Sequence, residues 1–113
     1  MDSKTAVTAL NALSHESRLA AFRRLVQAGP EGLPVGELRE HLGLPPATLS
    51  AHLNVLRAAG LAVDERQGRS IRVRADFAHM NSLISYLTEN CCADGGACAP
   101  AAGCAPAKKG KLK

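Results

Sequence analysis

Apolar residues recur at helical spacing along the first quarter of the chain. Val7 and Leu10 belong to one such pattern over residues 4 to 13, and a second pattern covers residues 15 to 28. Ser14 suits the N-cap of the second segment, and the Gly29-Pro30 pair ends it. The sequence therefore predicts two amphipathic helices here.

Two further helical patterns follow with hardly any chain between them. The first covers residues 35 to 42, and Gly43 suits its C-cap. Pro45 and Pro46 fit the start of the second, which runs to Gly60. Two helices joined by so short a turn predict a helix-turn-helix.

The hydrophobic period then changes from helical to alternating. Leu61 and Val63 alternate with polar neighbours, residues 64 to 68 have the composition of a turn, and Ile71 and Val73 alternate with arginines. This pattern predicts two strands joined by a turn. A β-hairpin that follows a helix-turn-helix is a wing.

The helical period returns at Asp76, which suits an N-cap, and an apolar stripe runs to about Asn90. Because the stripe is too apolar for an exposed surface, we expect the two terminal helices to pack together and against a second copy. The predicted fold is mainly α-helical, a winged helix-turn-helix with the order ααααββα that forms a homodimer. We expect this domain over residues 1–90 and a flexible Cys-containing, Lys-rich tail over residues 91–113.

Charge and composition exclude several classes of protein. The four lysines near the C-terminal end account for the formal net charge of +4, so a nucleic-acid surface must come from local clusters. The opening residues lack a signal-peptide pattern and no segment is long enough to span a bilayer, so we expect a cytoplasmic protein without membrane contact. The sequence shows neither a nucleophile paired with a general base nor a phosphate-binding glycine loop, so we expect that the protein is not an enzyme.

Polar side chains gather on the outward face of the second helix of the helix-turn-helix and on the hairpin. Short hydroxyl and amide groups suit base edges and phosphates, and arginines on a wing suit the DNA backbone or minor groove. The alternative is a compact fold whose arginines are simply solvated. The candidate DNA-contacting residues are Thr48, Ser50, Ala51, His52, Asn54, Arg66, Arg69 and Arg72.

These residues resemble the ArsR/SmtB family of winged helix-turn-helix repressors over residues 7 to 90. The matching segments are Ser50-Ala51-His52-Leu53, the LRAAGL run at residues 56–61, Arg66-Gln67-Gly68-Arg69, and residues 12–25. The chain departs from the family at Pro45-Pro46-Ala47, where members more often have Ser and Gln. The resemblance implies a dimer that represses by binding double-stranded operator DNA and that an effector, often a metal or metalloid ion, releases.

All four cysteines lie within a short segment that follows the last predicted helix. In a reducing cytosol they are better explained as metal ligands or redox thiols than as structural disulfides. Three thiolates suit trivalent arsenic or antimony, and a fourth would suit tetrahedral zinc or cadmium. The candidate ligands are Cys91, Cys92 and Cys98, with Cys104 as an additional candidate.

The spacing Cys-Cys-x5-Cys resembles that of arsenic-responsive members of the family. The resemblance implies that As(III), or Sb(III), binds Cys91, Cys92 and Cys98 and derepresses arsenic-resistance genes. Asp76 and His79 lack histidine partners near the other end of the last helix, so we expect His79 at the surface or in the dimer interface. The alternatives are a zinc, cadmium, lead or thiol-redox sensor of the same fold, a thiol-rich sequestration protein, and a tail that binds nothing.

Overall fold

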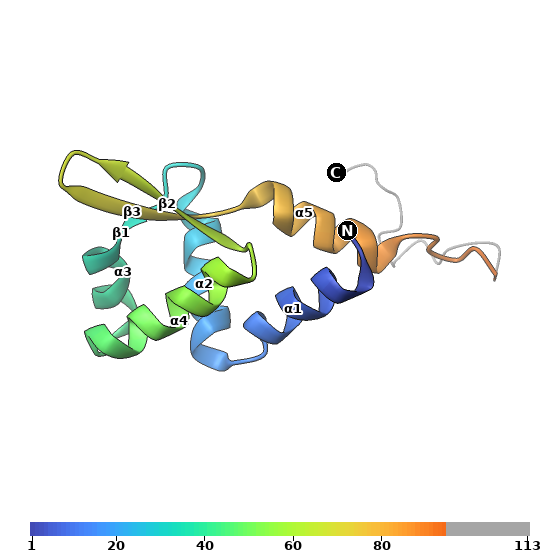
Figure 1. The fold of residues 1–113 in the computed structure, drawn as a ribbon, viewed down its shortest axis with the longest axis horizontal. Helices are drawn as coiled ribbons and strands as arrows, with labels where there is room; N and C mark the ends of the chain where they lie inside the picture. Colours follow the sequence, from blue (N-terminus) through green and yellow to red (C-terminus); the bar gives the residue numbers. More distant parts are fainter. Residues whose placement is uncertain (95–113) are drawn as a thin grey trace.

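The computed structural model describes residues 1–94 and confirms the predicted fold class (Figure 1). Five helices and a small antiparallel sheet follow one another within this range in the expected order, with one additional short strand. The elements are α1 (Ser3–Leu13), α2 (Glu16–Ala28), β1 (Leu33–Pro34), α3 (Val35–Leu42), α4 (Pro46–Ala58), β2 (Ala62–Gln67), β3 (Ser70–Ala75) and α5 (Phe77–Thr88).

The sheet has the strand order β1-β3-β2, and it differs from the prediction in two ways. β1 was missed because a strand of two residues shows no alternation. The predicted turn at residues 64–68 was wrong, because β2 continues to Gln67, which pairs with Ser70. The true turn is a two-residue loop whose first residue, Gly68, has a φ of 62°, as a type II′ hairpin requires.

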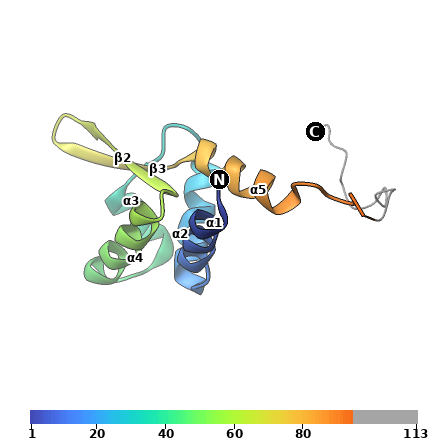
Figure 2. The same ribbon diagram turned by 45° about the vertical axis from the view of Figure 1, so that its right-hand side comes forward.

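The polar residues that suggested an early turn instead line an exposed two-stranded ribbon. Beyond its base the ribbon projects from the body of the molecule, so its side chains face solvent on both sides (Figure 2). Polar composition therefore does not distinguish a turn from a wing strand. The hairpin itself was predicted correctly.

The core lies between the helix-turn-helix, α2 and the base of the sheet. Leu49, Leu53 and Leu56 of α4 are at most 1% exposed, which confirms the predicted inward face of this helix. Burying three leucines on one face stabilises the fold by several kcal/mol, at about 2 kcal/mol for each side chain. The opposite face of α4 is thereby held toward solvent.

The predicted helix ends are mostly confirmed. Gly43 ends α3 in the left-handed conformation, and the Asp76 carboxylate accepts a hydrogen bond from the His79 N–H at 3.0 Å to cap α5. Ser14 was wrong as the N-cap of α2, because its Oγ donates to the Asn11 carbonyl at 2.8 Å and so belongs to the end of α1. The imidazole of His15 caps α2 instead.

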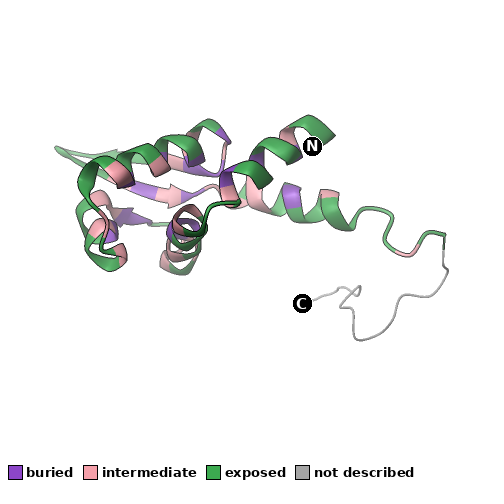
Figure 3. Cartoon of the chain, turned by 90° about the horizontal axis from the view of Figure 1, so that it is seen from below, coloured by how far each residue is buried: buried purple, intermediate pink, exposed green. Residues whose placement is uncertain are grey.

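The terminal helices α1 and α5 contact each other, and much of each helix is exposed to solvent (Figure 3). In α1 the small residues Ala6, Ala9 and Ala12 face the core, whereas the larger Val7 is 53% exposed. In α5, Leu83 is buried but Leu87 is 58% exposed. Within residues 1–94, no helix is long and apolar enough to cross a membrane.

Candidate nucleic-acid interface and cysteine site

The outward face of α4 carries the predicted polar residues. Ser50, Ala51 and Asn54 are exposed, and Thr48 is half-buried. Pro45 precedes the helix and Pro46 is its first residue, and no side chain caps this end. The N–H groups of the first turn are therefore open, and they carry the partial positive charge of a helix N-terminus. Such an end suits a phosphate group, even though it lacks the Ser and Gln that are usual in the family that the sequence resembles.

His52 is also on α4, but its ring is not fully turned to solvent. It packs against His15 at a ring-centroid distance of 4.7 Å. Burial lowers the pKa of His52 below its usual 6.5, and the charges of His15 and Arg18 lower that pKa further. His52 therefore contacts α2 as well as facing outward. No spacing pattern in the sequence links His15 to His52, so this contact was missed.

An ion pair joins the recognition helix α4 to the wing. Arg57 Nε lies 2.9 Å from Asp64 Oδ1 on β2, and Arg57 Nη1 donates to Asn54 Oδ1 at 2.9 Å. One guanidinium thus fixes the orientation of a candidate base-reading amide and ties it to the wing. The spacing of Asn54 and Arg57, three residues apart on a helix, could have indicated this pair.

The three candidate DNA-contacting arginines of the wing fall into two groups. Arg66 and Arg69 are exposed next to the hairpin turn, and neither has an ion-pair partner within residues 1–94. Arg72 donates from Nε to the Glu31 carbonyl at 3.0 Å and from Nη2 to the Gly32 carbonyl at 3.1 Å. The guanidinium of Arg72 therefore holds the loop before β1, whereas Arg66 and Arg69 are placed to meet a polyanion.

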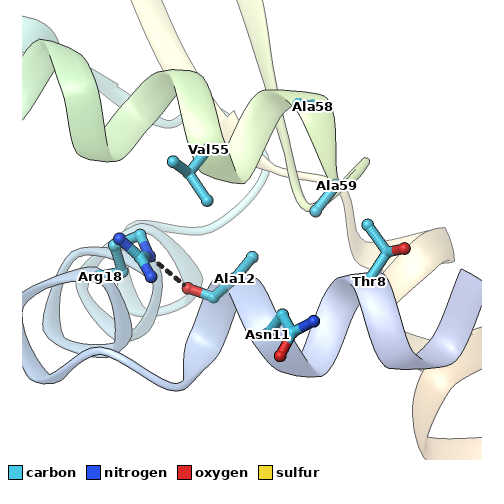
Figure 4. Close-up of a pocket in the computed structure, with 7 residues that line it drawn as sticks. All are labelled: Thr8, Asn11, Ala12, Arg18, Val55, Ala58 and Ala59. Atoms are coloured by element: carbon cyan, nitrogen blue, oxygen red, sulfur yellow. Dashed lines mark hydrogen bonds between the residues drawn. The ribbon is translucent and has the colours of Figure 1, made fainter.

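Arg18, on α2, bonds the end of α1 and lines a cavity that the recognition helix also lines. Its Nε donates to the Ala12 carbonyl at 2.8 Å, and Figure 4 shows its side chain opposite Val55 of α4. These residues line a cavity of about 350 Å³ between α1 and α4. A shift of α1 would therefore reach the back of α4.

The first turn of α5 touches the segment that follows the recognition helix. A Cβ placed on Gly60, just after α4, would lie 3.1 Å from Cε1 of His79, so the ring packs directly on this glycine. The Nε2 atom of His79 is shielded from solvent and has no hydrogen-bond partner within residues 1–94. The prediction of a surface histidine was therefore wrong, whereas the alternative of a dimer-interface histidine stays a prediction.

The first two cysteines follow the end of α5 directly. Asn90 and Cys92 have φ values of 59° and 63°, and the Sγ atoms of Cys91 and Cys92 lie 3.5 Å apart. Cys98 and Cys104 lie outside the described residues. Within residues 1–94, no group of three His, Cys, Asp or Glu side chains is arranged to hold a metal ion. A complete thiolate site would therefore need a ligand from beyond Asp94.

Several known proteins are similar to this chain in sequence. Residues 13–66 match a family described as a helix-turn-helix domain. The HTH-type transcriptional regulator NmtR of Mycobacterium tuberculosis is 38% identical over 87 residues, which cover 74% of this chain and 70% of that protein. The biofilm growth-associated repressor of Xylella fastidiosa is 34% identical over 84 residues, 74% of this chain and 71% of that protein.

A solved structure is similar to this chain in fold as well. The ArsR-like transcriptional regulator from Rhodococcus sp. RHA1 superposes with a TM-score of 0.67 at 30% identity, covering 74% of this chain and 76% of that one. The chain belongs to the ArsR/SmtB family. Members of this family are DNA-binding transcriptional regulators, which confirms the expectation that the chain is not an enzyme.

Membership in the ArsR/SmtB family identifies α3 and α4 as the two helices of the helix-turn-helix and the β2–β3 hairpin as the wing. In such a motif the second helix is the one that enters the major groove. The exposed residues of α4 and the two arginines at the hairpin turn are on these elements. Family membership therefore favours a role in DNA binding over the alternative of a compact fold whose arginines are simply solvated.

Proposed function

We propose that this ArsR-family regulator is a homodimeric repressor that holds operator DNA and releases it when As(III) or Sb(III) binds its cysteines. Cys91, Cys92 and Cys98 would be the three ligands, with Cys104 as an additional ligand for other ions. The observation that carries the proposal is the 3.5 Å separation of the Cys91 and Cys92 Sγ atoms immediately after α5. Genes for arsenic resistance would be the regulated genes.

The DNA contacts would come from α4 and the wing. Ser50, Ala51 and Asn54 face solvent on α4, where they could reach base edges in the major groove. Arg66 and Arg69 at the hairpin turn could contact phosphates or the minor groove. Arg72 would contribute indirectly, because its guanidinium is bonded to the carbonyls of the loop before β1.

The exposed faces of α1 and α5 support a dimer. Val7 and Leu10 of α1 are 53% and 42% exposed, and Ile84 and Leu87 of α5 are 51% and 58% exposed. Apolar residues gathered on two adjoining helices at one end of a domain are typical of an interface. A two-fold dimer would present two copies of α4 to an operator with matching half-sites. Residues 1–90 would form this dimeric domain and residues 91–113 the tail.

The chemistry of the cysteines favours a soft, thiophilic ion. Thiolates bind such ions more strongly than they bind hard cations, and trivalent arsenic takes three sulfur ligands. Two of the three proposed sulfur ligands lie close together, and in the reduced protein the third would come from the following segment. Closing so short a loop costs little entropy.

Release of DNA requires a path from the end of α5 to α4. The opposite end of α5 packs on Gly60 through His79, and α1, which contacts α5, reaches the back of α4 through Arg18. Metalloid binding that shifts α5 would therefore act on the recognition helix from two sides. A coupling free energy of about 1 to 3 kcal/mol would be enough to lower operator occupancy substantially.

The experiment is fluorescence anisotropy of the reduced full-length protein on labelled DNA from upstream of its own gene, titrated separately with arsenite and with zinc. We expect DNA binding that arsenite reverses at stoichiometric levels and zinc leaves unchanged. Cys91→Ser and Cys92→Ser should bind DNA normally but not respond, while Cys104→Ser serves as the matched control and should still respond to arsenite.

Other results would contradict this proposal or favour one of the alternatives. A normal arsenite response in Cys91→Ser or Cys92→Ser would contradict the ligand assignment. Release by zinc alone, lost in Cys104→Ser, would favour a four-cysteine zinc or cadmium sensor. Absence of salt-dependent DNA binding would favour the sequestration protein.

A further inference from the structure

A pocket on the outer side of α2 has a cationic lining and no acidic residue. It has a volume of about 200 Å³ and lies between α2 and the last turn of α3. It is separate from the cysteines and from the exposed face of α4. The lining residues are Ala20, Arg23, Arg24, Gln27, His41 and Leu42.

The polar groups of this pocket lack partners in the part of the chain that the structure describes. Arg24 Nε is shielded from solvent and donates to no acceptor within residues 1–94. Both ion pairs found in this range lie elsewhere, so neither Arg23 nor Arg24 is paired with a carboxylate there. A buried donor without an acceptor is unfavourable, since it has lost its hydrogen bonds to water. The pocket therefore has the donors for a ligand that is itself an acceptor.

The donor set indicates the chemical class of that ligand. Two guanidinium groups offer N–H donors in fixed planar geometry, a pattern that suits the oxygens of a phosphate group. Gln27 adds an amide donor. His41 lies in the last turn of α3 and adds a ring N–H donor. A ligand with several negatively charged oxygens could satisfy all of these groups together.

We infer that the pocket formed by Arg23, Arg24, Gln27 and His41 binds a phosphate group. The first helix of a helix-turn-helix crosses the DNA backbone, and His41 is only two residues before the turn at Gly43 that leads to the recognition helix. A backbone phosphate beside the operator half-site is therefore one source of the group. A free phosphate ion is the other, and both are recognised by the same donors.

The test has two arms that separate these sources, and the DNA arm rests on the proposed function. In the first arm, the melting temperature is measured in inorganic phosphate and in chloride of equal ionic strength. In the second, the salt dependence of operator affinity is measured. Arg24→Met and Arg23→Gln are compared in both arms with Lys4→Gln, a matched loss of one charge on exposed α1, remote from the pocket.

A free phosphate ligand predicts that phosphate raises the melting temperature of the wild type and of Lys4→Gln more than chloride does. Arg24→Met would lose that difference while melting at the same temperature as the wild type in chloride, or higher, because it removes an unpaired donor. A backbone phosphate predicts that each pocket variant lowers the slope of log affinity against log salt by about 1, with Lys4→Gln unchanged.

Each remaining outcome is also decisive. If the pocket variants match Lys4→Gln in both arms, the inference is overturned, and normal operator binding by the wild type would leave the proposed function intact. If the wild type does not bind the operator, the proposed function fails, and the melting measurements alone decide whether the pocket binds phosphate. Should Arg24→Met not fold, Arg23→Gln provides the same comparison from an exposed position.

Discussion

The imidazole rings of His15 and His52 lie 4.7 Å apart, and this contact joins the N-cap of α2 to the recognition helix. Nδ1 of His15 accepts a hydrogen bond from the Ser17 N–H at 3.1 Å, which caps α2. Burial of the His52 ring, together with the charges of His15 and Arg18, lowers the pKa of His52. The folded protein therefore favours the neutral form of His52.

This pair makes the stability of the fold depend on pH. The pKa of His52 is lowered below 6.5 in the folded chain, so below that pH the unfolded chain binds a proton that the folded chain does not. We expect the free energy of unfolding to fall as the pH drops below about 6.5, and to stop falling for this reason below the folded-state pKa. Urea unfolding at about pH 7.5 and about pH 5.5 measures the difference.

Two variants test the assignment to this pair. His52→Gln removes the titrating ring and should flatten the pH dependence. His15→Asn keeps an N-cap oxygen while removing the neighbouring imidazole, so it should flatten the dependence partly without unfolding α2. A pH dependence equal to that of the wild type in both variants would show that other groups cause it.

Two glycines of the same backbone conformation should respond differently to substitution. Gly32 and Gly43 have φ values of 69° and 68°. A Cβ on Gly32 would overlap the Val73 carbonyl, whereas a Cβ on Gly43 would meet nothing within 4 Å. We expect Gly43→Ala to cost about 1 kcal/mol of stability, from the left-handed conformation alone, and Gly32→Ala to cost at least about twice as much. Equal losses in urea unfolding would contradict this account.

Arg57, whose guanidinium bonds both Asn54 and Asp64, should matter more for DNA binding than for stability. Its side chain and that of Asp64 are 29% and 42% exposed, and such partly exposed pairs contribute about 1 kcal/mol or less. Arg57→Ala should therefore change the unfolding free energy little. It should weaken operator binding several-fold, since Asn54 and the wing lose their common partner.

Arg57→Lys is the matched control for charge. A lysine keeps the positive charge but cannot bond Asn54 and Asp64 at once in the planar geometry of a guanidinium. We expect its operator affinity to resemble that of Arg57→Ala. An affinity equal to that of the wild type would show that only the charge is needed. Anisotropy titrations at one salt concentration provide the comparison.

The sequence predicted features that depend on neighbours along the chain. The leucine face of α4, the glycine at the end of α3 and the Asp76 cap all follow from spacing within one or two turns. Because the buried face of α4 was predicted correctly, Ser50, Ala51 and Asn54 were also predicted correctly to face outward, whereas Thr48 and His52 are half-buried. Family motifs in the same segment then added the expectation of DNA binding.

Features that depend on distant parts of the chain could not be predicted. The bonds from Arg72 to the carbonyls of Glu31 and Gly32 span about forty positions, and no local pattern distinguishes this arginine from Arg66 or Arg69. The contact between His15 and His52 likewise exists only in the folded chain. Tertiary structure therefore divides the arginines that composition had placed in one candidate group into exposed ones, Arg66 and Arg69, and one that bonds a neighbouring loop, Arg72.

The exposed face of α5 gives a direct test of the proposed dimer. Ile84 and Leu87 lie on the same side of the helix and are 51% and 58% exposed. A charge on this face would be desolvated in an interface, so Ile84→Asp and Leu87→Asp should give monomers at concentrations where the wild type is dimeric. Ser82→Asp places the same charge on the opposite, exposed side of α5 and should remain dimeric. Sedimentation equilibrium distinguishes the two states.

Loss of the dimer should also weaken operator binding, because two linked copies of α4 and the wing bind two half-sites far more tightly than separate copies do. We expect the monomeric variants to bind a single half-site as well as the wild type does, since α4 and the wing are unchanged. Dimeric Ile84→Asp and Leu87→Asp proteins would show that this face does not form the interface. Monomers with wild-type operator affinity would contradict the requirement for two-fold symmetry in DNA recognition.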